Sequence, residues 1–487
     1  MNASQPLRSI AVFGGGVVAL SAAVAFARAL PRAALTWIAT PVDPAALADR
    51  LPTLWPSSGA MLHRLGLDER MLVAAGAANH RLAQRFTNWS RAGEPWMAPE
   101  GEPIGAPGRG ALHQRWLDAA AAGLTLPYHT LFPAAVLAEA DRFALPLPPA
   151  LDRTDHALRL DASSLGQALA DALRRGGARA ADGSIAAVRR ADDDRITAVQ
   201  LTDGRLVDAD LYVDATGPTS PLQAETARTA WSDSLPADRL LLAPDPAMPP
   251  SLADTYDAVD LGWSARWPMP RGGVRALAYG SAAATEPRAR RALGVGRDTA
   301  TLVACSPGRL EAAWRGNCLA LGEAAAQPGP LTLPGFSLAL AQLGLALDLL
   351  PGRDMEPLLI AEYNRRAALR ADRVRDYVAA HYLLGARSRG PFWQALQGRD
   401  MPPALARTIA QFRRRGHLPH HEEEGVNPDG WRAMLIGQGL RPQRRDPVAM
   451  SNDPAALATG LQAARARLAA TVGAVPSYRD WLAGVRR

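Results

Sequence analysis

Hydrophobic and polar positions near the start of the chain follow two periods in turn. Ser9-Ile10-Ala11-Val12-Phe13 is a short apolar run typical of a buried strand, and Val17 to Arg28 is a longer run of small and apolar residues typical of a helix. Gly14-Gly15-Gly16 separates the two runs, and a second strand-like run, Leu35 to Ile38, follows them. This order predicts a βαβ unit that begins a parallel sheet.

Hydropathy alone allows a second interpretation of the same stretch. Ile10 to Ala27 is apolar apart from Ser21, which is also typical of a membrane span or a signal peptide. A glycine triplet inside the run and a strand directly after it favour the βαβ unit. Because no other stretch is long and apolar enough to cross a bilayer, we expect a cytoplasmic protein with no membrane partner.

Further elements follow from the same patterns. The sequence predicts helices over 112–123, 161–175 and 336–350, and strands over 185–188, 198–201, 210–214 and 317–322. Asp203-Gly204 lies between alternating runs and predicts a hairpin that joins 198–201 to 210–214. Trp231 to Gly308 mixes strand-like runs with prolines, and the chain from Glu356 onward is almost wholly helical.

Together these elements predict an α/β fold with three parts. A Rossmann-like nucleotide-binding core spans residues 1–350, with an inserted β-sheet layer at about 104–160 and 220–310. A helical C-terminal region spans 351–487.

Composition narrows the chemistry. The net charge is +7, and all 54 Lys+Arg residues are arginine, so no step can use a lysine amine. The densest basic runs, Arg413 to Arg415 and Arg441 to Arg445, are short and lack interleaved aromatic residues, which favours a solvated basic surface and no nucleic-acid partner. Cys305 and Cys318 form neither a disulfide framework nor a metal-ligand pattern.

One histidine cluster has the composition of a metal site but not its spacing. His417, His420 and His421 precede Glu422 to Glu424, an arrangement that matches neither a zinc helix nor a zinc knuckle. We expect a solvated polar loop and no metal. No Gly-x-Ser-x-Gly elbow occurs, so hydrolase chemistry has no support.

The glycine turn predicts a dinucleotide site. Gly14 allows the tight turn, Gly16 lets the backbone approach a pyrophosphate, and Ala19 is the smallest substitute for a third glycine. The N-terminus of the next helix presents unpaired N–H groups to phosphates. The acid that usually holds the ribose is replaced by Ala39, with Thr40 and Asp43 as the nearest polar substitutes.

Five motifs share the order and spacing of a known family. They are Gly316 to Gly322 (GNCLALG), His381-Tyr382 with Pro391 to Trp393 (PFW), Trp431 to Gly439 (WRAMLIGQG), His113 to Leu117 (HQRWL) and Asp214 to Gly217 (DATG). Together they resemble the flavin-dependent tryptophan halogenases over nearly the whole chain.

The resemblance implies FAD as the cofactor. It places FAD near Gly14, Gly15, Gly16, Ala19, Ala39, Asp214, Gly217, Gly322, Leu331 and Gly335. In this family a separate reductase supplies reduced FAD, and oxygen then oxidises halide to hypohalous acid. A lysine and a glutamate direct that oxidant onto a small aromatic substrate.

Both members of this catalytic pair differ in the present chain. Arg81 stands at the lysine position of Arg81 to Trp89 (RLAQRFTNW), and its guanidinium stays protonated and cannot form a haloamine. It either hydrogen-bonds an oxidant or an anionic substrate, or it is structural. Thr332 stands at the glutamate position of Gly329 to Gly335 (GPLTLPG), and a threonine is no general base at neutral pH.

Two further segments depart from the family pattern. The W-x-W-x-I-P segment that separates flavin from substrate is Gly262 to Pro268 (GWSARWP) here, so Ala265 replaces one tryptophan and Trp267 lies two residues beyond it. The sequence leaves open whether this barrier is intact. The G-x-G-E strap over the flavin has no counterpart in Ala45 to Arg50, which predicts weak or lost FAD binding.

Three functions remain open from the sequence. The first is an FAD-dependent oxidoreductase of monooxygenase type that acts on a small aromatic or electron-rich substrate without lysine-dependent halogenation. The second is a non-catalytic binding or scaffold protein with the same fold. The third is an indole halogenase in which Arg81 replaces the lysine as a hydrogen-bond donor.

Overall fold

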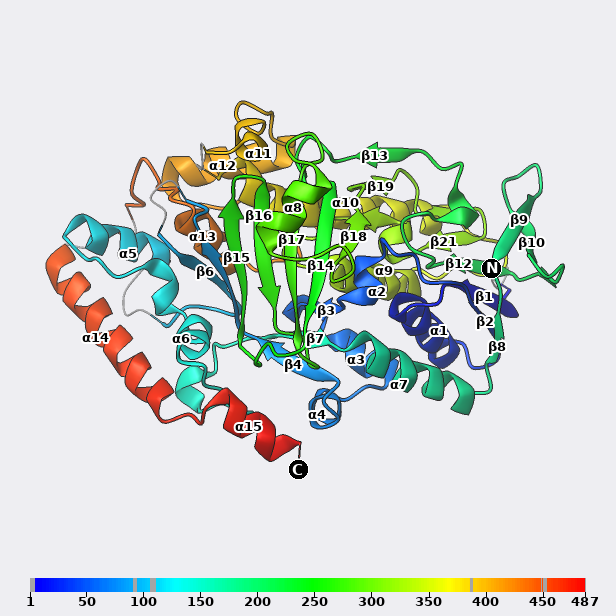
Figure 1. Ribbon diagram of the computed structural model, residues 1–487, viewed down its shortest axis with the longest axis horizontal. Helices are drawn as coiled ribbons and strands as arrows, with labels where there is room; N and C mark the ends of the chain where they lie inside the picture. The colour runs from blue at the N-terminus through cyan, green and yellow to red at the C-terminus, as the bar shows by residue number, and fades with distance from the viewer. Residues whose placement is uncertain are drawn as a thin grey trace. The chain divides into compact units, whose positions relative to one another are not determined.

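A computed structural model describes residues 5–90, 94–105, 111–385, 389–447, 449 and 453–486 (Figure 1). The chain divides into two compact units. The first consists of Met1–Leu72, Arg159–Asp238 and Val303–Arg375, and the second of Val73–Leu158, Arg239–Leu302 and Asp376–Arg487.

The first unit is built on a six-stranded sheet in the order β20-β21-β12-β1-β2-β8. β1 (Ser9–Phe13) lies inside it and pairs in parallel with β2 (Ala34–Ala39) and β12 (Leu211–Asp214). β8 (Arg179–Asp182) and β21 (Cys318–Ala320) extend the parallel part, and β20 (Trp314–Arg315) is antiparallel. This arrangement confirms the predicted α/β, Rossmann-like core.

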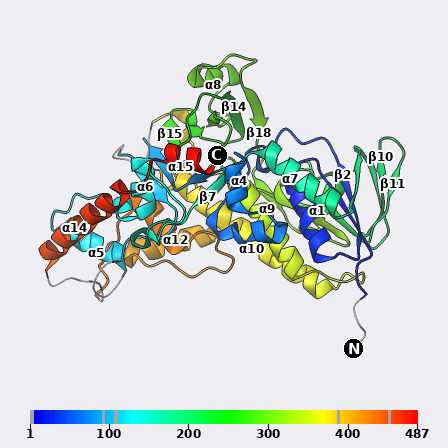
Figure 2. The same cartoon turned by 90° about the horizontal axis from the view of Figure 1, so that it is seen from below.

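The glycine turn leads into α1 (Val17–Ala29), which lies beside α7 (Ala162–Arg175) in both ribbon views (Figures 1 and 2). α9 (Gly335–Asp348) also contacts α1. Residues 17–26 are all buried, which explains why the hydropathy of this helix resembles that of a membrane span. None of the described helices is long and apolar enough to cross a membrane.

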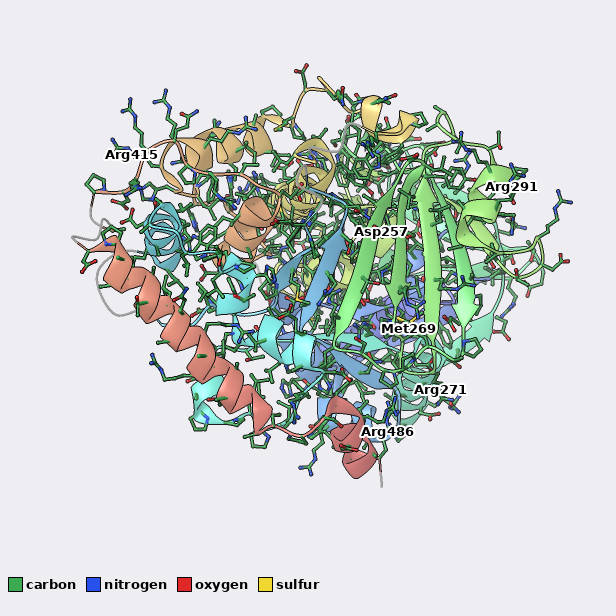
Figure 3. The ribbon with its side chains drawn as sticks, turned by 60° about the vertical axis from the view of Figure 1, so that its left-hand side comes forward. Asp257, Met269, Arg271, Arg291, Arg415 and Arg486 are labelled. Atoms are coloured by element: carbon green, nitrogen blue, oxygen red, sulfur yellow. The ribbon has the colours of Figure 1, made fainter. Side chains whose placement is uncertain are left out.

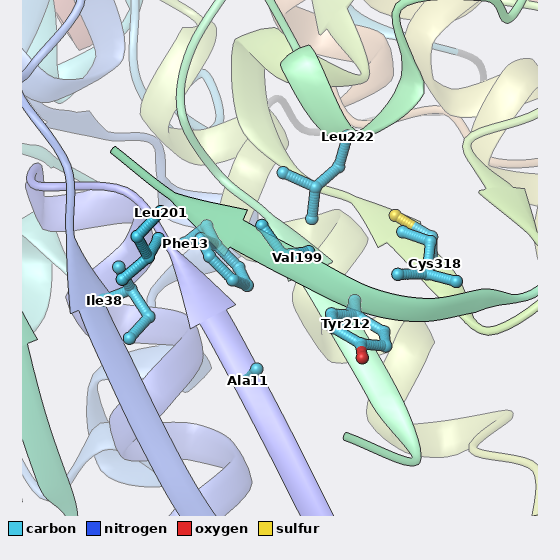
Figure 4. Packing of buried hydrophobic residues seen from close by; sticks show 9 residues of the cluster. Ala11, Phe13, Ile38, Val199, Leu201, Tyr212, Leu222 and Cys318 are labelled. Carbon is cyan, nitrogen blue, oxygen red and sulfur yellow. The ribbon is translucent and has the colours of Figure 1, made fainter. Parts of the chain in front are cut away.

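A small sheet of β9 (Ile185–Arg190), β10 (Ile196–Leu201) and β11 (Leu206–Val207) packs on the face of the main sheet that carries Ala11 and Phe13. Figure 4 shows Val199 and Leu201 of β10 against Phe13 and Ile38. Burial of these apolar side chains joins the two sheets.

The predicted hairpin is only partly correct. β10 pairs antiparallel with β11 around Asp203-Gly204, but β12 pairs in parallel with β1. The reason is burial: every residue of β12 is buried, as in a central parallel strand, whereas β11 is short and partly exposed.

The second unit contains an antiparallel sheet of β14 (Arg239–Asp245), β17 (Gly273–Tyr279), β16 (Gly262–Trp267) and β15 (Ala253–Val259), in that order. β5 (Ala83–Thr87) adds to β15 in parallel, and β6 (Trp96–Pro99) adds to β5. α8 (Glu286–Leu293) packs on this sheet through Ala289.

The C-terminal helices divide between the units, unlike the predicted separate region 351–487. α10 (Pro357–Leu383) begins in the first unit, and residues from Asp376 onward belong to the second. There α13 (Pro428–Gly437) packs against β6, and α14 (Pro454–Gly473) packs against α5 (Leu112–Ala121) and α6 (Pro133–Ala140). Within the predicted insert 104–160, residues 106–110 lie outside the described residues.

The remaining elements are short or connect the parts described above. They are α2 (Leu47–Arg50), β3 (Thr53–Leu54), α3 (Ala60–Leu65), α4 (Glu69–Ala74), β4 (Ala78–Arg81), β7 (Ala157–Leu160), β13 (Arg228–Ala230), β18 (Thr301–Ala304), β19 (Gly308–Leu310), β22 (Ala326–Gln327), α11 (Pro391–Gln394), α12 (Pro403–Arg415) and α15 (Tyr478–Val485).

Arginines of the second unit are spread over its surface. The labelled Arg271, Arg291, Arg415 and Arg486 come from different elements and project outward at separate places (Figure 3). The solvated basic surface stays a prediction.

Candidate functional site

The glycine turn has the close packing that a dinucleotide fold requires. Gly14 has φ +142°, and a Cβ atom at this position would lie 2.3 Å from the Ala215 carbonyl oxygen and 2.7 Å from Cβ of Ala19. The Trp37 indole N–H donates to the Gly14 carbonyl at 2.8 Å. Gly14 and Ala19 therefore serve the packing of the turn itself, and only a glycine fits at position 14.

The N-terminus of α1 is occupied by an acidic side chain of the same unit. Gly16 caps the helix without a side chain, and the Asp49 carboxylate accepts the Val18 N–H through Oδ1 at 2.8 Å and also accepts the Val17 N–H. A Cβ atom at Gly16 would lie 2.0 Å from the Asp49 carboxyl carbon. Asp49 thus binds where helix N–H groups and the helix dipole favour an anion.

A second buried acid supports Asp49. The Glu323 Oε2 accepts the Ala48 N–H at 2.9 Å, at the start of the short helix α2 that carries Asp49. Burial raises the pKa of Asp49 to about 6, although its backbone hydrogen bonds lower it. Burial raises the pKa of Glu323 to about 8, with added repulsion from Asp49 and Asp43. At neutral pH the neutral form of Glu323 therefore predominates beside an ionised Asp49.

Residues 40–49 cover the glycine faces that the resemblance assigns to FAD. A Cβ atom at Gly15 would lie 2.0 Å from the Thr40 carbonyl oxygen. A Cβ at Gly217 would lie 3.0 Å from Cβ of Asp43, and one at Gly335 would lie 3.3 Å from Cβ of Ala48. We call residues 40–49 the cover segment. Because these glycines have no side chains, the cover segment packs directly against their backbone.

Asp214 organises the loop that follows β12. Its Oδ1 accepts the Thr216 N–H at 3.1 Å and the Thr216 hydroxyl at 2.7 Å, and its Oδ2 accepts the Ser220 hydroxyl at 3.1 Å and the Leu222 N–H at 3.0 Å. Burial raises the pKa of Asp214 above its usual range in spite of these bonds. Its contacts among the described residues explain loop geometry, and its nearness to FAD stays a prediction.

The end of β2 offers little to a ribose. Ala39 has no polar atom to contribute, and the hydroxyl of Thr40 is buried without a hydrogen-bond partner among the described residues. Asp43 instead accepts the Ala45 N–H through Oδ1 at 2.8 Å, a turn within its own segment.

The loop from Gly329 to Gly335 is strained. Thr332 has φ +66° and Leu333 has φ +50°, a region that non-glycine residues rarely adopt. Thr332 and Leu331 are fully buried, and the Thr332 hydroxyl has no hydrogen-bond partner in the part of the chain that the structure describes. Strain and an unsatisfied hydroxyl are retained where surrounding structure enforces them, often at functional sites.

Gly322 has a packing role in the first unit. It has φ +64°, and its added Cβ would lie 2.9 Å from a Val18 methyl group. Its N–H donates to Gln342 at 2.8 Å. A side chain at this position would push against α1 near the helix N-terminus.

Arg81, which the resemblance places at the lysine position, lies in the second unit and is held by two acids. Its NH2 group donates to Glu100 at 2.9 Å, and its NH1 group donates to Asp254 at 3.1 Å. The Arg81 side chain is 1% exposed and the Asp254 side chain is 0% exposed. Burial lowers the pKa of Arg81, but the two carboxylates outweigh burial and raise it above its ordinary value. Two nitrogens of the guanidinium therefore donate to carboxylates of the same unit.

Aromatic side chains fill the region of the altered tryptophan motif. Trp263 and Trp267 alternate with exposed positions along β16, so they share one face, and both are fully buried with ring centroids 6.3 Å apart. The Trp267 indole donates to the Tyr256 hydroxyl at 3.1 Å, and that of Trp263 to the Tyr382 hydroxyl at 2.9 Å. Trp267 therefore restores aromatic bulk to the face on which Ala265 lies.

The structure gathers most predicted site residues in the first unit. Gly14, Gly15, Gly16, Ala19, Ala39, Asp214, Gly217, Gly322, Leu331, Thr332 and Gly335 all belong to it. Arg81 belongs to the second unit. Sequence reasoning missed Asp49 and Glu323: the first is the only acid in the helix Leu47–Arg50, and the second directly follows the GNCLALG strand.

The histidine cluster has ordinary polar contacts. His421 Nε2 lies 2.9 Å from the Thr408 hydroxyl, and His417 Nε2 lies 3.6 Å from an Asp446 carboxylate oxygen. His417 and His421 thus each have a polar neighbour on another segment, and the polar loop stays a prediction.

Comparison with known proteins fits this architecture. Residues 9–454 match the sequence profile of the family described as tryptophan halogenase. The chain belongs to the tryptophan halogenase family. Its relatives are flavin-dependent halogenases, so the family is one of FAD-dependent oxidoreductases.

Three relatives illustrate the match. Tryptophan 7-halogenase RebH of Lentzea aerocolonigenes is 26% identical over 450 residues, covering 84% of this chain and 82% of its own. The structure is similar to BrvH, a flavin-dependent halogenase from Brevundimonas sp. BAL3, with 28% identity and a TM-score of 0.90 over 99% of both chains. It is also similar to Xcc4156, a flavin-dependent halogenase from Xanthomonas campestris, with 25% identity and a TM-score of 0.91 over 99% of both chains.

The site fits the pyrophosphate of the family's cofactor in one respect. The Asp49 carboxylate acts as a stand-in anion and shows that the Val17 and Val18 N–H groups bind negative charge. The same carboxylate fills the position, and Ala39 provides no acid for the ribose.

Proposed function

We propose that this halogenase-family protein is an FAD-dependent oxidoreductase of monooxygenase type that does not transfer halogen through a side-chain amine. The observation that carries this proposal is the burial of Arg81 between Glu100 and Asp254. Two of its nitrogens donate to these carboxylates, and a protonated guanidinium has no lone pair for a halogen. The substrate would be a small aromatic or otherwise electron-rich molecule, as in the family.

The chain's own residues would hold the cofactor at the start of α1. The turn Gly14 to Gly16 and the N–H groups of Val17 and Val18 would bind the pyrophosphate, and Gly217, Gly322 and Gly335 would line the site. When bound in reduced form, FAD supplies two electrons for oxygen activation. With these two electrons and two protons from solvent, one oxygen atom of O₂ would enter the substrate and the other would leave as water.

Thr332 supports a reaction that needs no general base. Its hydroxyl stays protonated at neutral pH and is a donor in a fully buried loop. The hydroxyl is therefore able to donate a hydrogen bond to an oxygen atom. It cannot remove a proton from a ring carbon, whereas a glutamate at this position, as the resemblance implies for the family, would assist that removal.

Product analysis tests this proposal. The purified protein is supplied with FAD, a separate flavin reductase, NADH and a panel of indoles and phenols, with and without bromide, and with catalase to remove free peroxide. We expect products heavier by one oxygen atom that form equally well without bromide. Brominated products that require the protein would overturn the proposal in favour of halogenation.

A second function has support from Asp49. A carboxylate in the pyrophosphate position, together with Ala39, favours a non-catalytic member of the fold that serves as a binding partner. Titration of the protein with oxidised and reduced FAD separates the two functions. The absence of binding at tens of micromolar would favour the non-catalytic one.

A further inference from the structure

The strongest unassigned feature of the molecule is the pairing of Asp49 with α1. An aspartate usually caps the helix that directly follows it, from the N-cap position. Asp49 instead caps a helix that lies 31 residues earlier in the chain, from within α2. Two neighbouring N–H groups donate to it, so the contact is that of a bound anion.

A second and independent set of contacts shows that three further residues of the cover segment lie against glycines assigned to FAD. Thr40 lies against Gly15, Asp43 against Gly217 and Ala48 against Gly335, each at a glycine where a Cβ atom would crowd it. These glycines come from three separate parts of the chain. The cover segment therefore lies against three glycines at which the resemblance places FAD.

The closed arrangement leaves polar atoms unsatisfied. The Thr40 hydroxyl and the Asp43 Oδ2 are buried, and neither has a hydrogen-bond partner among the described residues. Burial also raises the pKa of Asp49 to about 6, so at neutral pH the closed form holds an ionised carboxylate away from water. Release of the segment would restore water to all three groups, which lowers the cost of opening.

We propose that Asp49 is a built-in competitor of the FAD pyrophosphate, and that FAD binds only when Asp49 leaves the N-terminus of α1. This inference rests on the proposed function, because it takes FAD as the ligand. The two anions need the same N–H groups of Val17 and Val18, so they exclude one another. Glu323 holds the competitor in place through the Ala48 N–H.

Binding measurements on two variants test the competition. FAD and ADP, which shares the pyrophosphate, are titrated against the full-length protein by calorimetry. Asp49→Ala removes the competing anion, whereas Asp49→Asn keeps its shape and a weaker neutral cap. We expect affinity for both ligands to rise at least about ten-fold in Asp49→Ala and by less in Asp49→Asn.

Asp453→Ala is the matched control. Asp453 caps α14 by accepting the Ala456 N–H at 2.9 Å, in the second unit. Its loss removes a similar helix cap without touching the cradle, so FAD affinity should not change. Circular dichroism of each variant establishes that it is folded.

Hydrogen exchange distinguishes competition by Asp49 from a purely structural role of this residue. A ligand normally slows exchange where it binds. Here FAD should accelerate exchange of the amides of residues 43–50 in the wild-type protein while the Val18 amide stays protected.

Each outcome decides a different point. Unchanged or weaker FAD binding by Asp49→Ala, with binding by the wild type, would overturn the inference and leave the proposed function standing. Binding by Asp49→Ala alone would support the inference and overturn the proposed function. Failure of both proteins to bind FAD would overturn both.

Discussion

Arg81 and Asp254 form an ion pair of 3.1 Å that is almost completely shielded from water. Glu100 completes the cluster from the other side of the guanidinium, at 2.9 Å. The residue that we predict at the position of the family's lysine is therefore paired with one fully buried acid and one largely buried acid.

Removal of this guanidinium should destabilise the second unit. Arg81→Met leaves Glu100 and Asp254 without their shared cation, and we expect a loss of about 3–5 kcal/mol in the free energy of unfolding. Arg81→Lys should lose less, because it keeps the charge but donates poorly to both acids at once. Urea denaturation measures both. The exposed Arg291→Ala is the control, with a change within about 0.5 kcal/mol. Equal stability of Arg81→Met and wild type would contradict a structural role.

The contribution of Asp49 and Glu323 to stability should fall as pH rises from about 4 to 8. Asp49 and Glu323 have pKa values raised from 3.8 to about 6 and from 4.5 to about 8. The folded state therefore retains protons that the unfolded state has already released, so stability is lost as pH rises through these pKa values. For Asp49 alone, the loss is on the order of 2–3 kcal/mol by pH 7.

The double variant Asp49→Asn, Glu323→Gln isolates this effect. Its amides cannot ionise, so its stability should depend less on pH than that of the wild type. Thermal denaturation at pH 4, 5, 6, 7 and 8 compares the two proteins. Parallel pH curves would show that neither acid contributes.

Trp267 should carry a large part of the aromatic packing in the second unit. Trp267→Ala removes a fully buried ring and the donor to the Tyr256 hydroxyl, and we expect a loss of about 3–5 kcal/mol. Trp267→Phe keeps much of the volume and should lose less. Leu358→Ala, at a side chain that is 78% exposed, is the control with little effect in urea denaturation. A stability of Trp267→Ala equal to that of the wild type would contradict the buried position of the Trp267 ring.

Asp214→Asn should loosen the loop after β12. An amide offers one acceptor oxygen, but four donors from Thr216, Ser220 and Leu222 face this side chain. At least one donor pair then meets an NH₂ group, and we expect a loss of about 2–4 kcal/mol. Faster hydrogen exchange of the Leu222 amide checks the cause. An unchanged Leu222 amide would assign any loss to another origin.

Local patterns were sufficient to predict the core elements. The turn Gly14 to Gly16 with β1, α1 and β2 follows from a glycine triplet between two apolar runs, and the helix Ala162–Arg175 from its amphipathic period. The strand Leu211–Asp214 was predicted, but its partner was not. Choice of partner depends on burial by distant segments, which no local pattern contains.

The candidate site shows the same limit more sharply. The contact of Asp49 with Val18 spans 31 residues, that of Glu323 with Ala48 spans 275, and that of Arg81 with Asp254 spans 173. Each is a polar contact between residues that look ordinary in sequence. The composition shows that no lysine is available, but the two acids that pair with Arg81 are identified only by the three-dimensional structure.

The cover segment also has a consequence for the flavin content of the purified protein. An anion tethered to the chain competes at a constant effective concentration, whatever the amount of protein. The apparent dissociation constant for FAD then equals the intrinsic one divided by the open fraction, so roughly one open molecule in a hundred weakens binding about a hundred-fold. FAD would bind reversibly, as an exchangeable substrate does, and would dissociate on dilution. A colourless preparation is therefore the expected state of the intact protein.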